Sequence, residues 1–141
     1  MEVSNIKQQV RDVFDPLAIR LGLNVFVELS QTSTNFHLGY ANQRIGLEIE
    51  VEMLDFFIYG LLFRPCGSVL PIGYTDSDGK RQKLYVQQAL KELSINTNQE
   101  THTIQKLGGD YRNCREMAEI LARLIEQHWQ ELSNKPAQWF S

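Results

Sequence analysis

Residues 44–64, near the middle of the chain, constrain its fold more than any other part of the sequence. The first half of this stretch alternates apolar residues with Glu48, Glu50 and Glu52. Because strand side chains point to opposite faces at a period of two, the alternation predicts a half-buried strand. The second half, residues 56–63, is a short aromatic and branched run that is typical of a strand. Together they predict a β-hairpin with one apolar face and one acidic face.

The residues before this hairpin predict a helix and two further strands. Apolar residues recur at helical spacing over residues 4–21, which predicts an amphipathic helix. Pro16 lies inside that pattern, and since proline lacks a backbone donor, we expect a kink or a break into two short helices there. Strands are predicted at 24–30 and 36–40, so that four sequential strands with short links form a meander.

The residues after the hairpin predict a loop and two helices. Glycine, proline and aspartate dominate residues 65–79, which is the chemistry of a loop. A helix is predicted over residues 79–94, and the polar residues 95–103 are expected to form an exposed loop, with a short edge strand at 101–106. A long helix follows Asp110, a good N-cap. The predicted fold is a single α+β domain, residues 1–141, in which an antiparallel four-stranded meander carries the N-terminal helix and two C-terminal helices on one face.

The composition excludes several classes of protein. The chain has 141 residues and a formal net charge of -3, so clustered basic residues for nucleic acid are not expected. Cys66 and Cys114 are far apart and lack a zinc-ligand spacing, which favours a reduced cytoplasmic location. The sequence shows neither a signal-peptide pattern nor an apolar run long enough to cross a bilayer. We therefore expect a cytoplasmic protein with no membrane association.

The acidic face of the hairpin is the leading candidate for a binding site. Carboxylates side by side on a strand repel one another, and a metal or a basic partner would relieve that repulsion. A solvated sheet face is the simpler interpretation. The loop adds two further acids, but a calcium loop is not indicated because its glycine falls two positions too early. The predicted binding residues are Glu48, Glu50, Glu52, Asp76 and Asp78.

No catalytic, metal-ligating or cofactor-binding residues are predicted. His37, His102 and His128 share no spacing that would bring them together as metal ligands. The sequence also lacks a GxSxG nucleophile motif and a glycine-rich phosphate loop. An enzymatic function would therefore rest on no specific pattern.

Several short motifs occur in an order that is similar to a known family. They are VRDVFDPLA at 10–18, LGL at 21–23, FHLG at 36–39, IGLEIE at 45–50, FIYG at 57–60 and DYRN at 110–113. This order resembles the C-terminal region of bacterial proteins of the PD-(D/E)XK nuclease superfamily, whose nuclease signature lies in a separate preceding domain. In this chain Glu52 occupies the position of the lysine after Glu50, and the letters of Asp78-Gly79-Lys80 fall in a predicted turn. The resemblance thus implies a module without the nuclease signature.

Two functional hypotheses follow. The first is a non-catalytic protein-interaction module of a bacterial defence or toxin-related system, which binds a basic partner such as a toxin or nuclease as an antitoxin or immunity protein does. The sequence pI of about 5.6 suits that role. The alternative is a metal-dependent nuclease, or a catalytically inactive remnant of one. The non-enzymatic hypothesis is favoured, without a cofactor, and a homodimer is a further expectation.

Overall fold

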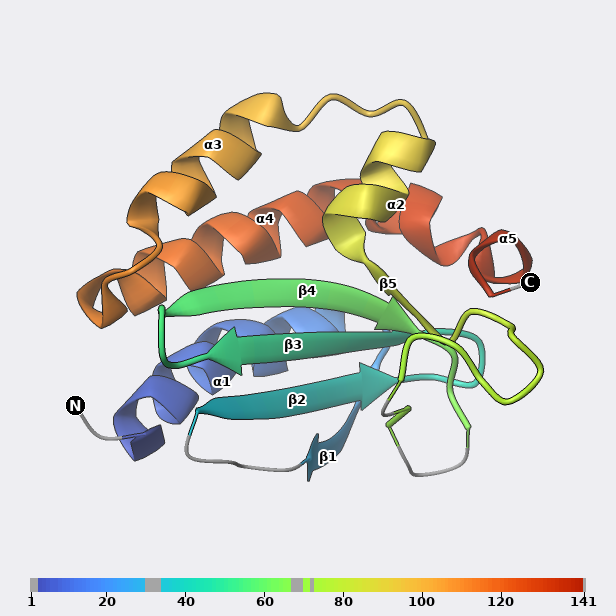
Figure 1. Cartoon of the computed structure of the whole chain (residues 1–141), viewed down its shortest axis with the longest axis horizontal. Coiled ribbons are helices and arrows are strands. Elements are labelled where there is room, and N and C mark those ends of the chain that lie inside the picture. Colours follow the sequence, from blue (N-terminus) through green and yellow to red (C-terminus); the bar gives the residue numbers. More distant parts are fainter. Residues whose placement is uncertain (1–2, 30–33, 67–69, 72, 141) are drawn as a thin grey trace.

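The computed structural model describes residues 3–29, 34–66, 70–71 and 73–140. A long helix opens the chain, five strands follow, and the remaining helices close it (Figure 1). The elements are α1 (Val3–Arg20), β1 (Asn24–Leu29), β2 (Asn35–Ala41), β3 (Gly46–Glu52), β4 (Phe57–Phe63), β5 (Lys83–Tyr85), α2 (Val86–Glu92), α3 (Asn98–Leu107), the 3₁₀-helix η1 (Tyr111–Asn113), α4 (Cys114–Ser133) and α5 (Pro136–Trp139).

The strands form one antiparallel sheet in the order β1-β2-β3-β4-β5. The predicted α+β class and the meander of β1 to β4 are confirmed, and the short strand β5 extends the sheet beyond β4. The short connection from β2 to β3 places His37 directly opposite Glu50, and the hairpin of β3 and β4 places Glu50 opposite Tyr59. These pairings determine which side chains meet on each face of the sheet.

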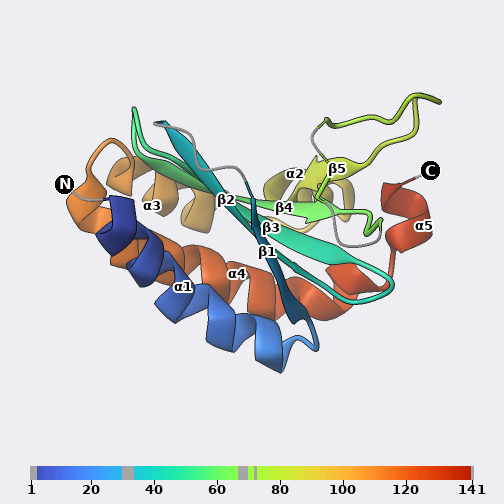
Figure 2. The same ribbon diagram turned by 90° about the horizontal axis from the view of Figure 1, so that it is seen from below.

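Helices α1 and α4 lie side by side against one face of the sheet (Figure 2). The apolar residues of the central strands point toward these helices, and Ile49 is fully buried there. Burial of such aliphatic side chains is the main favourable contribution to folding. The helices thus explain why β3 alternates so regularly: its apolar residues face α1 and α4, and its glutamates face the other way.

Of the two outcomes predicted at Pro16, a kink or a break, the break does not occur. The helix runs from Val3 to Arg20 and is not divided at the proline. Phe14 and Leu17, on either side of Pro16, are fully buried in the core, whereas Pro16 itself is exposed. Packing of the apolar stripe therefore overrides the local preference of proline to end a helix. The end of the helix at Gly22, with a φ of 75°, has the left-handed conformation of a glycine cap.

Two predictions for the C-terminal half are wrong. The helix predicted over residues 79–94 begins only at Val86, because residues 83–85 pair with β4 as strand β5. The exposed loop and edge strand predicted between 95 and 106 are replaced over most of their length by α3. That helix buries only Ile104 in the core, so its sequence carries little apolar signal. Ser30, the last residue of the first predicted strand, and residues 31–33 of the link that follows it lie outside the described residues.

The C-terminus docks on the core through α5. Trp139 is fully buried, and its Nε1 donates a hydrogen bond of 2.8 Å to the carbonyl oxygen of Leu132. Proline at the start of this short helix is favourable because its missing donor would be unsatisfied there in any residue. Among the helices that the structure describes, none is long and apolar enough to cross a membrane.

Candidate binding site on the open face of the sheet

Among the residues that the structure describes, those that cover the sheet face opposite α1 and α4 lie at one end of it. There the connection between β4 and β5 folds back, and Leu70 forms a small buried cluster with Ala41 and Phe63. Gly39 allows this close approach, since a Cβ atom there would lie 2.9 Å from Leu70 Cδ1. At the other end His37, Glu50 and neighbouring residues remain only partly buried. We call this uncovered part the open face.

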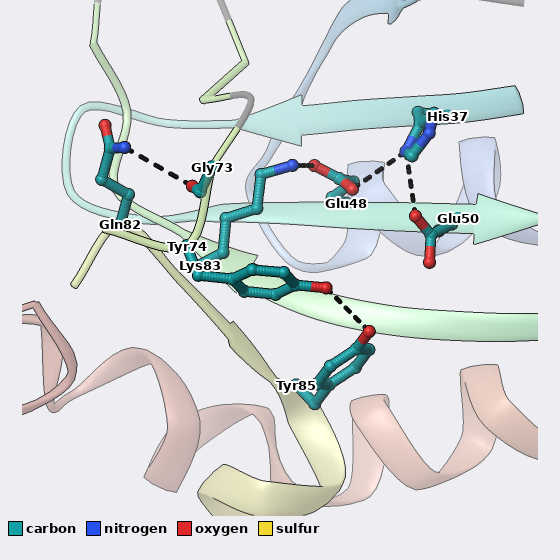
Figure 3. Close-up of polar contacts among 8 residues, drawn as sticks. All are labelled: His37, Glu48, Glu50, Gly73, Tyr74, Gln82, Lys83 and Tyr85. Atoms are coloured by element: carbon teal, nitrogen blue, oxygen red, sulfur yellow. Dashed lines mark hydrogen bonds and ion pairs between the residues drawn. The ribbon is translucent and has the colours of Figure 1, made fainter. Parts of the chain in front are cut away.

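The three predicted glutamates share the open face but differ in their surroundings. Glu48 is only 1% exposed, and its carboxylate lies between two basic side chains (Figure 3). Lys83 Nζ lies 2.8 Å from Oε1, and His37 Nδ1 lies 3.1 Å from Oε2. Glu48 is therefore not a surface residue available to a partner, which corrects the expectation of three equivalent exposed carboxylates.

The side chain of Glu52 forms hydrogen bonds with the turn of the β3–β4 hairpin. Its two carboxylate oxygens accept hydrogen bonds of 2.8 and 2.9 Å from the backbone N–H groups of Leu54 and Asp55. These bonds satisfy two donors of the turn between β3 and β4, as an acidic side chain does in an Asx-like turn. Glu52 thus stabilises the hairpin, and its charge remains close to the open face.

Glu50 is the partly exposed acid at the centre of the open face. Its Oε2 lies 3.7 Å from His37 Nδ1, and its side chain is 20% exposed. Burial raises the pKa of Glu50, and the charges of Glu48 and Glu52 add to that rise, while His37 and Lys83 act in the opposite direction. A carboxylate whose pKa is raised by burial and like charge gains from a nearby cation.

An aromatic row runs beside these acids. The ring centroid of Tyr59 lies 4.7 Å from that of Phe57 and 5.7 Å from that of Tyr85, and the Tyr85 ring lies 5.9 Å from Tyr74. The hydroxyl groups of Tyr74 and Tyr85 are 2.8 Å apart (Figure 3). The row comes from β4, β5 and the loop between them, and each of its members is at least partly exposed.

Carboxylates close to the aromatic row act on its tyrosines. Burial raises the pKa of Tyr59, and the carboxylates of Glu50, Glu52 and Asp55 raise it further. Burial likewise raises the pKa of Tyr85, with smaller contributions from Tyr74 and Glu50. These carboxylates oppose the formation of a phenolate, which means that they would favour a cation placed near the same rings.

Two cations near the row are already paired. Lys83 is the partner of Glu48, and Arg81 Nη1 lies 3.7 Å from Glu92 Oε2. Their charges are thus largely balanced by partners of their own. We call Glu50, Glu52, Phe57, Tyr59, Tyr74 and Tyr85 together the aromatic–acidic patch.

The two predicted aspartates lie in the loop rather than in this patch. Asp76 Oδ1 accepts backbone hydrogen bonds from Asp78 and Lys80, and its Oδ2 lies 2.8 Å from Arg64 Nη2. The Arg64 guanidinium and the backbone donors hold the pKa of Asp76 below its usual range. Asp76 therefore organises the turn, and Asp78 is exposed beside it. Binding at these two residues stays a prediction.

The sequence prediction missed His37, Lys83 and the tyrosines. The signal for His37 was present, because counting back from the tight connection between β2 and β3 pairs it with Glu50. Lys83 was hidden because residues 79–94 were predicted as a helix. With strand β5 in place, Lys83 and Tyr85 lie on the same face as Glu48 and Tyr59.

One group of side chains has the spacing of metal ligands. His37 Nδ1 and one carboxylate oxygen each from Glu48 and Glu50 lie within 4.8 Å of one another. Nitrogen and carboxylate oxygen are both ligands of zinc and related cations. No such group was predicted, because its residues come from two strands and no spacing within the sequence indicates that they meet.

Comparison of the chain with known protein families, with curated proteins and with solved structures found no match. The α+β fold and the side chains of the open face are therefore what indicates a function.

Proposed function

We propose that this protein is a non-catalytic interaction module that binds a basic segment of a partner protein across the aromatic–acidic patch. The observation that supports the proposal is that a row of acidic side chains lies next to a row of aromatic side chains. Glu50 and Glu52 on β3 are paired in register with Tyr59 and Phe57 on β4. An acid and an aromatic ring therefore lie side by side at two successive positions of the face.

Arginine and lysine side chains are matched to such a surface. A cation over an aromatic ring gains about 0.5–1 kcal/mol at an exposed site and about 2 kcal/mol or more when water is excluded. The neighbouring carboxylates add attraction that increases the association rate, because complementary charges steer the encounter. The net charge of -3 acts in the same direction. An extended partner segment could present basic side chains at a period of two, matching the period of the strand residues beneath it.

A neutralising role toward a basic toxin or nuclease fits this surface. Antitoxin and immunity proteins act by charge and shape complementarity, which an acidic and aromatic patch supplies. Within the proposal, Glu48 and Lys83 have a supporting role. Their buried ion pair keeps the face in register while Glu50 and the tyrosines contact the partner.

Affinity capture with matched baits tests the proposal. The patch variant combines Glu50→Gln with Tyr59→Leu, which removes one charge and one ring but keeps an apolar residue on β4. The control variant combines Glu131→Gln with Tyr111→Leu, which makes the same chemical changes at exposed positions on α4 and η1. Glu48 is left unchanged because its loss would leave Lys83 buried without an anion.

We expect wild type and control to capture the same basic protein from the source cells, and the patch variant to lose most of it. The purified pair should then show faster association at low salt, with a weaker salt dependence in the patch variant. Equal capture by all three baits would contradict the proposal.

A second candidate function is a metal-dependent nuclease. The observation that favours it is the position of Lys83, which reaches the carboxylate of Glu48 from β5 and so joins a lysine to a pair of acids. Carboxylates that hold a metal together with a lysine that stabilises developing charge are the elements such a reaction needs. The test is cleavage of plasmid DNA in the presence of Mg²⁺. Activity that disappears in Lys83→Met would favour the nuclease, and its absence from the wild type would exclude it.

A further inference from the structure

We propose that His37, Glu48 and Glu50 form a binding site for a divalent transition-metal cation of the zinc type on the open face of the sheet. His37 Nδ1 lies 3.1 Å from Glu48 Oε2 and 3.7 Å from Glu50 Oε2. All three residues offer ligand atoms within 4.8 Å of one another. The site shares Glu50 with the aromatic–acidic patch but includes none of its rings, and zinc binding there does not depend on the proposed partner.

These separations suit a small tetrahedral ion. Zinc binds histidine nitrogen and carboxylate oxygen at about 2.0–2.2 Å, so two ligand atoms of a tetrahedral site lie about 3.3–3.5 Å apart. The distances from His37 Nδ1 to the two carboxylates, 3.1 and 3.7 Å, fall on either side of that range. Adjustments of a few tenths of an ångström would therefore bring the nitrogen to tetrahedral spacing from each oxygen. The two carboxylate oxygens lie within 4.8 Å of one another, and they would move closer together to share one ion.

The sheet holds the three ligands in place before any ion binds. His37 on β2 is directly opposite Glu50 on β3, and Glu48 is two residues away on the same face. Directly opposed and diagonal residues on one face of an antiparallel pair are close enough to interact. Both strands are internal to the sheet, with hydrogen-bonded neighbours on each side. Ligands on such rigid elements need little reorganisation to bind an ion.

Glu48 brings a nearly fully buried carboxylate to this group, with Oε1 against Lys83 and Oε2 beside His37. Its Oε1 is buried and accepts no hydrogen bond from the described residues, although Lys83 Nζ lies 2.8 Å away. The contact with Lys83 is thus an ion pair without hydrogen-bond geometry. Its Oε2 faces His37. A buried charge normally needs several directed partners. A cation at Oε2 would supply one.

Lys83 is a positioning residue in this arrangement. Lys83 is only 8% exposed and contacts Oε1 of Glu48, which leaves Oε2 directed toward His37. Partners that orient metal-binding side chains in this way commonly change metal affinity by about 10–100-fold when they are removed. When His37 is neutral, as a metal ligand must be, the two carboxylates and the lysine together carry one negative charge.

The ligand set also defines the class of cation. Imidazole nitrogen suits zinc and its transition-metal neighbours, whereas calcium takes about 6–8 oxygen ligands, more than this group can supply. The side chains of His37 and Glu50 are 19% and 20% exposed, so solvent reaches part of each. Three protein ligands with a fourth position open to water is a known arrangement for zinc.

Isothermal titration of the full chain with zinc chloride, and separately with calcium chloride, tests the inference. We expect one zinc ion per chain and no comparable binding of calcium. His37→Gln and Glu50→Gln should each weaken zinc binding at least tenfold, and Lys83→Met should change the affinity while the protein stays folded by circular dichroism. His102→Gln, a histidine exposed on α3, and Cys66→Ser, which removes an exposed thiol that could bind zinc, are the matched controls.

The histidine ring provides a readout that does not depend on affinity alone. Zinc should shift the NMR signals of the His37 imidazole in the wild type, while those of His102 stay in place. If binding is tight, the free and zinc-bound signals of His37 should be in slow exchange. Zinc binding that persists unchanged in both His37→Gln and Glu50→Gln would overturn the inference. So would binding that is lost in Cys66→Ser or His102→Gln, and so would the absence of stoichiometric binding to the wild type.

Discussion

Ile49 shows how strongly the contribution of a β3 residue to stability depends on the sheet face that its side chain occupies. The residue is fully buried against the helices, while Glu48 and Glu50 on either side face the opposite way. Ile49→Ala should lower the free energy of unfolding by about 2–5 kcal/mol, because it removes buried methyl groups and leaves a cavity. Denaturant titration measures this loss. A change below about 0.5 kcal/mol would be the size of a surface substitution and would contradict the assigned face.

The two cysteines should differ in reactivity. Cys114 is fully buried at the start of α4, and burial raises the pKa of its thiol to about 11, whereas Cys66 is exposed. Since the thiolate is the reactive form, a thiol reagent at mildly alkaline pH should modify Cys66 rapidly and Cys114 only after unfolding. Counting the modified thiols in the native and the denatured protein checks this. In Cys66→Ser no fast reaction should remain, and rapid modification of two thiols in the native wild type would refute the burial of Cys114.

At the same scale, the sequence predicted some site residues and concealed others. The shared face of Glu48, Glu50 and Glu52 could be predicted, because strict alternation on one strand places every second side chain on a common face whatever lies around it. Their unequal burial could not be predicted, since it depends on His37 from β2 and Lys83 from β5. Contacts between strands depend on the register of their pairing, which cannot be predicted from the residue pattern of one strand.

Among the elements, α1 shows packing prevailing over local preference. Proline at position 16 cannot donate to the carbonyl of Asp12, yet the helix continues because its apolar stripe is buried and the proline is exposed on the other side. Pro16→Ala should therefore stabilise the protein by about 1–3 kcal/mol. The restored helical hydrogen bond outweighs the extra entropy of the unfolded chain, which is about 0.4–1 kcal/mol. Thermal and denaturant unfolding would show the gain, and a loss of stability would mean that the helix requires the proline.

The C-terminal elements show the limits of periodicity. Strand β5 has three residues, too few for alternation to be distinguished from the start of a helix, and its pairing with β4 decides its conformation. Helix α3 is the converse case, since a helix with one buried residue has a composition like that of a loop. By contrast α4, which buries an apolar stripe along its length, was predicted as a helix, although it begins at Cys114 and the predicted N-cap Asp110 caps η1 instead. Periodicity thus succeeds in proportion to the apolar surface that an element buries.

On the scale of the whole molecule, helices cover one face of a twisted sheet and leave part of the other face to solvent (Figure 2). The helical side provides the apolar core and hence the stability. The open side carries charged and aromatic residues drawn from four successive segments, from β2 through to β5. If the open face binds the proposed partner, substitutions at its partly exposed residues, such as Glu50 and Tyr59, should alter binding more than folding.

The central claim is that the aromatic–acidic patch recognises basic side chains, and the NMR signals of the tyrosine rings test it most directly. The protein would be titrated with a short extended peptide that alternates arginine and threonine, and with a control peptide that has glutamate in place of arginine. We predict that the arginine peptide shifts the ring signals of Tyr59, Tyr74 and Tyr85 at low salt, that the glutamate peptide does not, and that Tyr111 outside the patch is unaffected. Shifts of equal size at Tyr111, or unmoved signals at Tyr59 and Tyr85, would contradict the account.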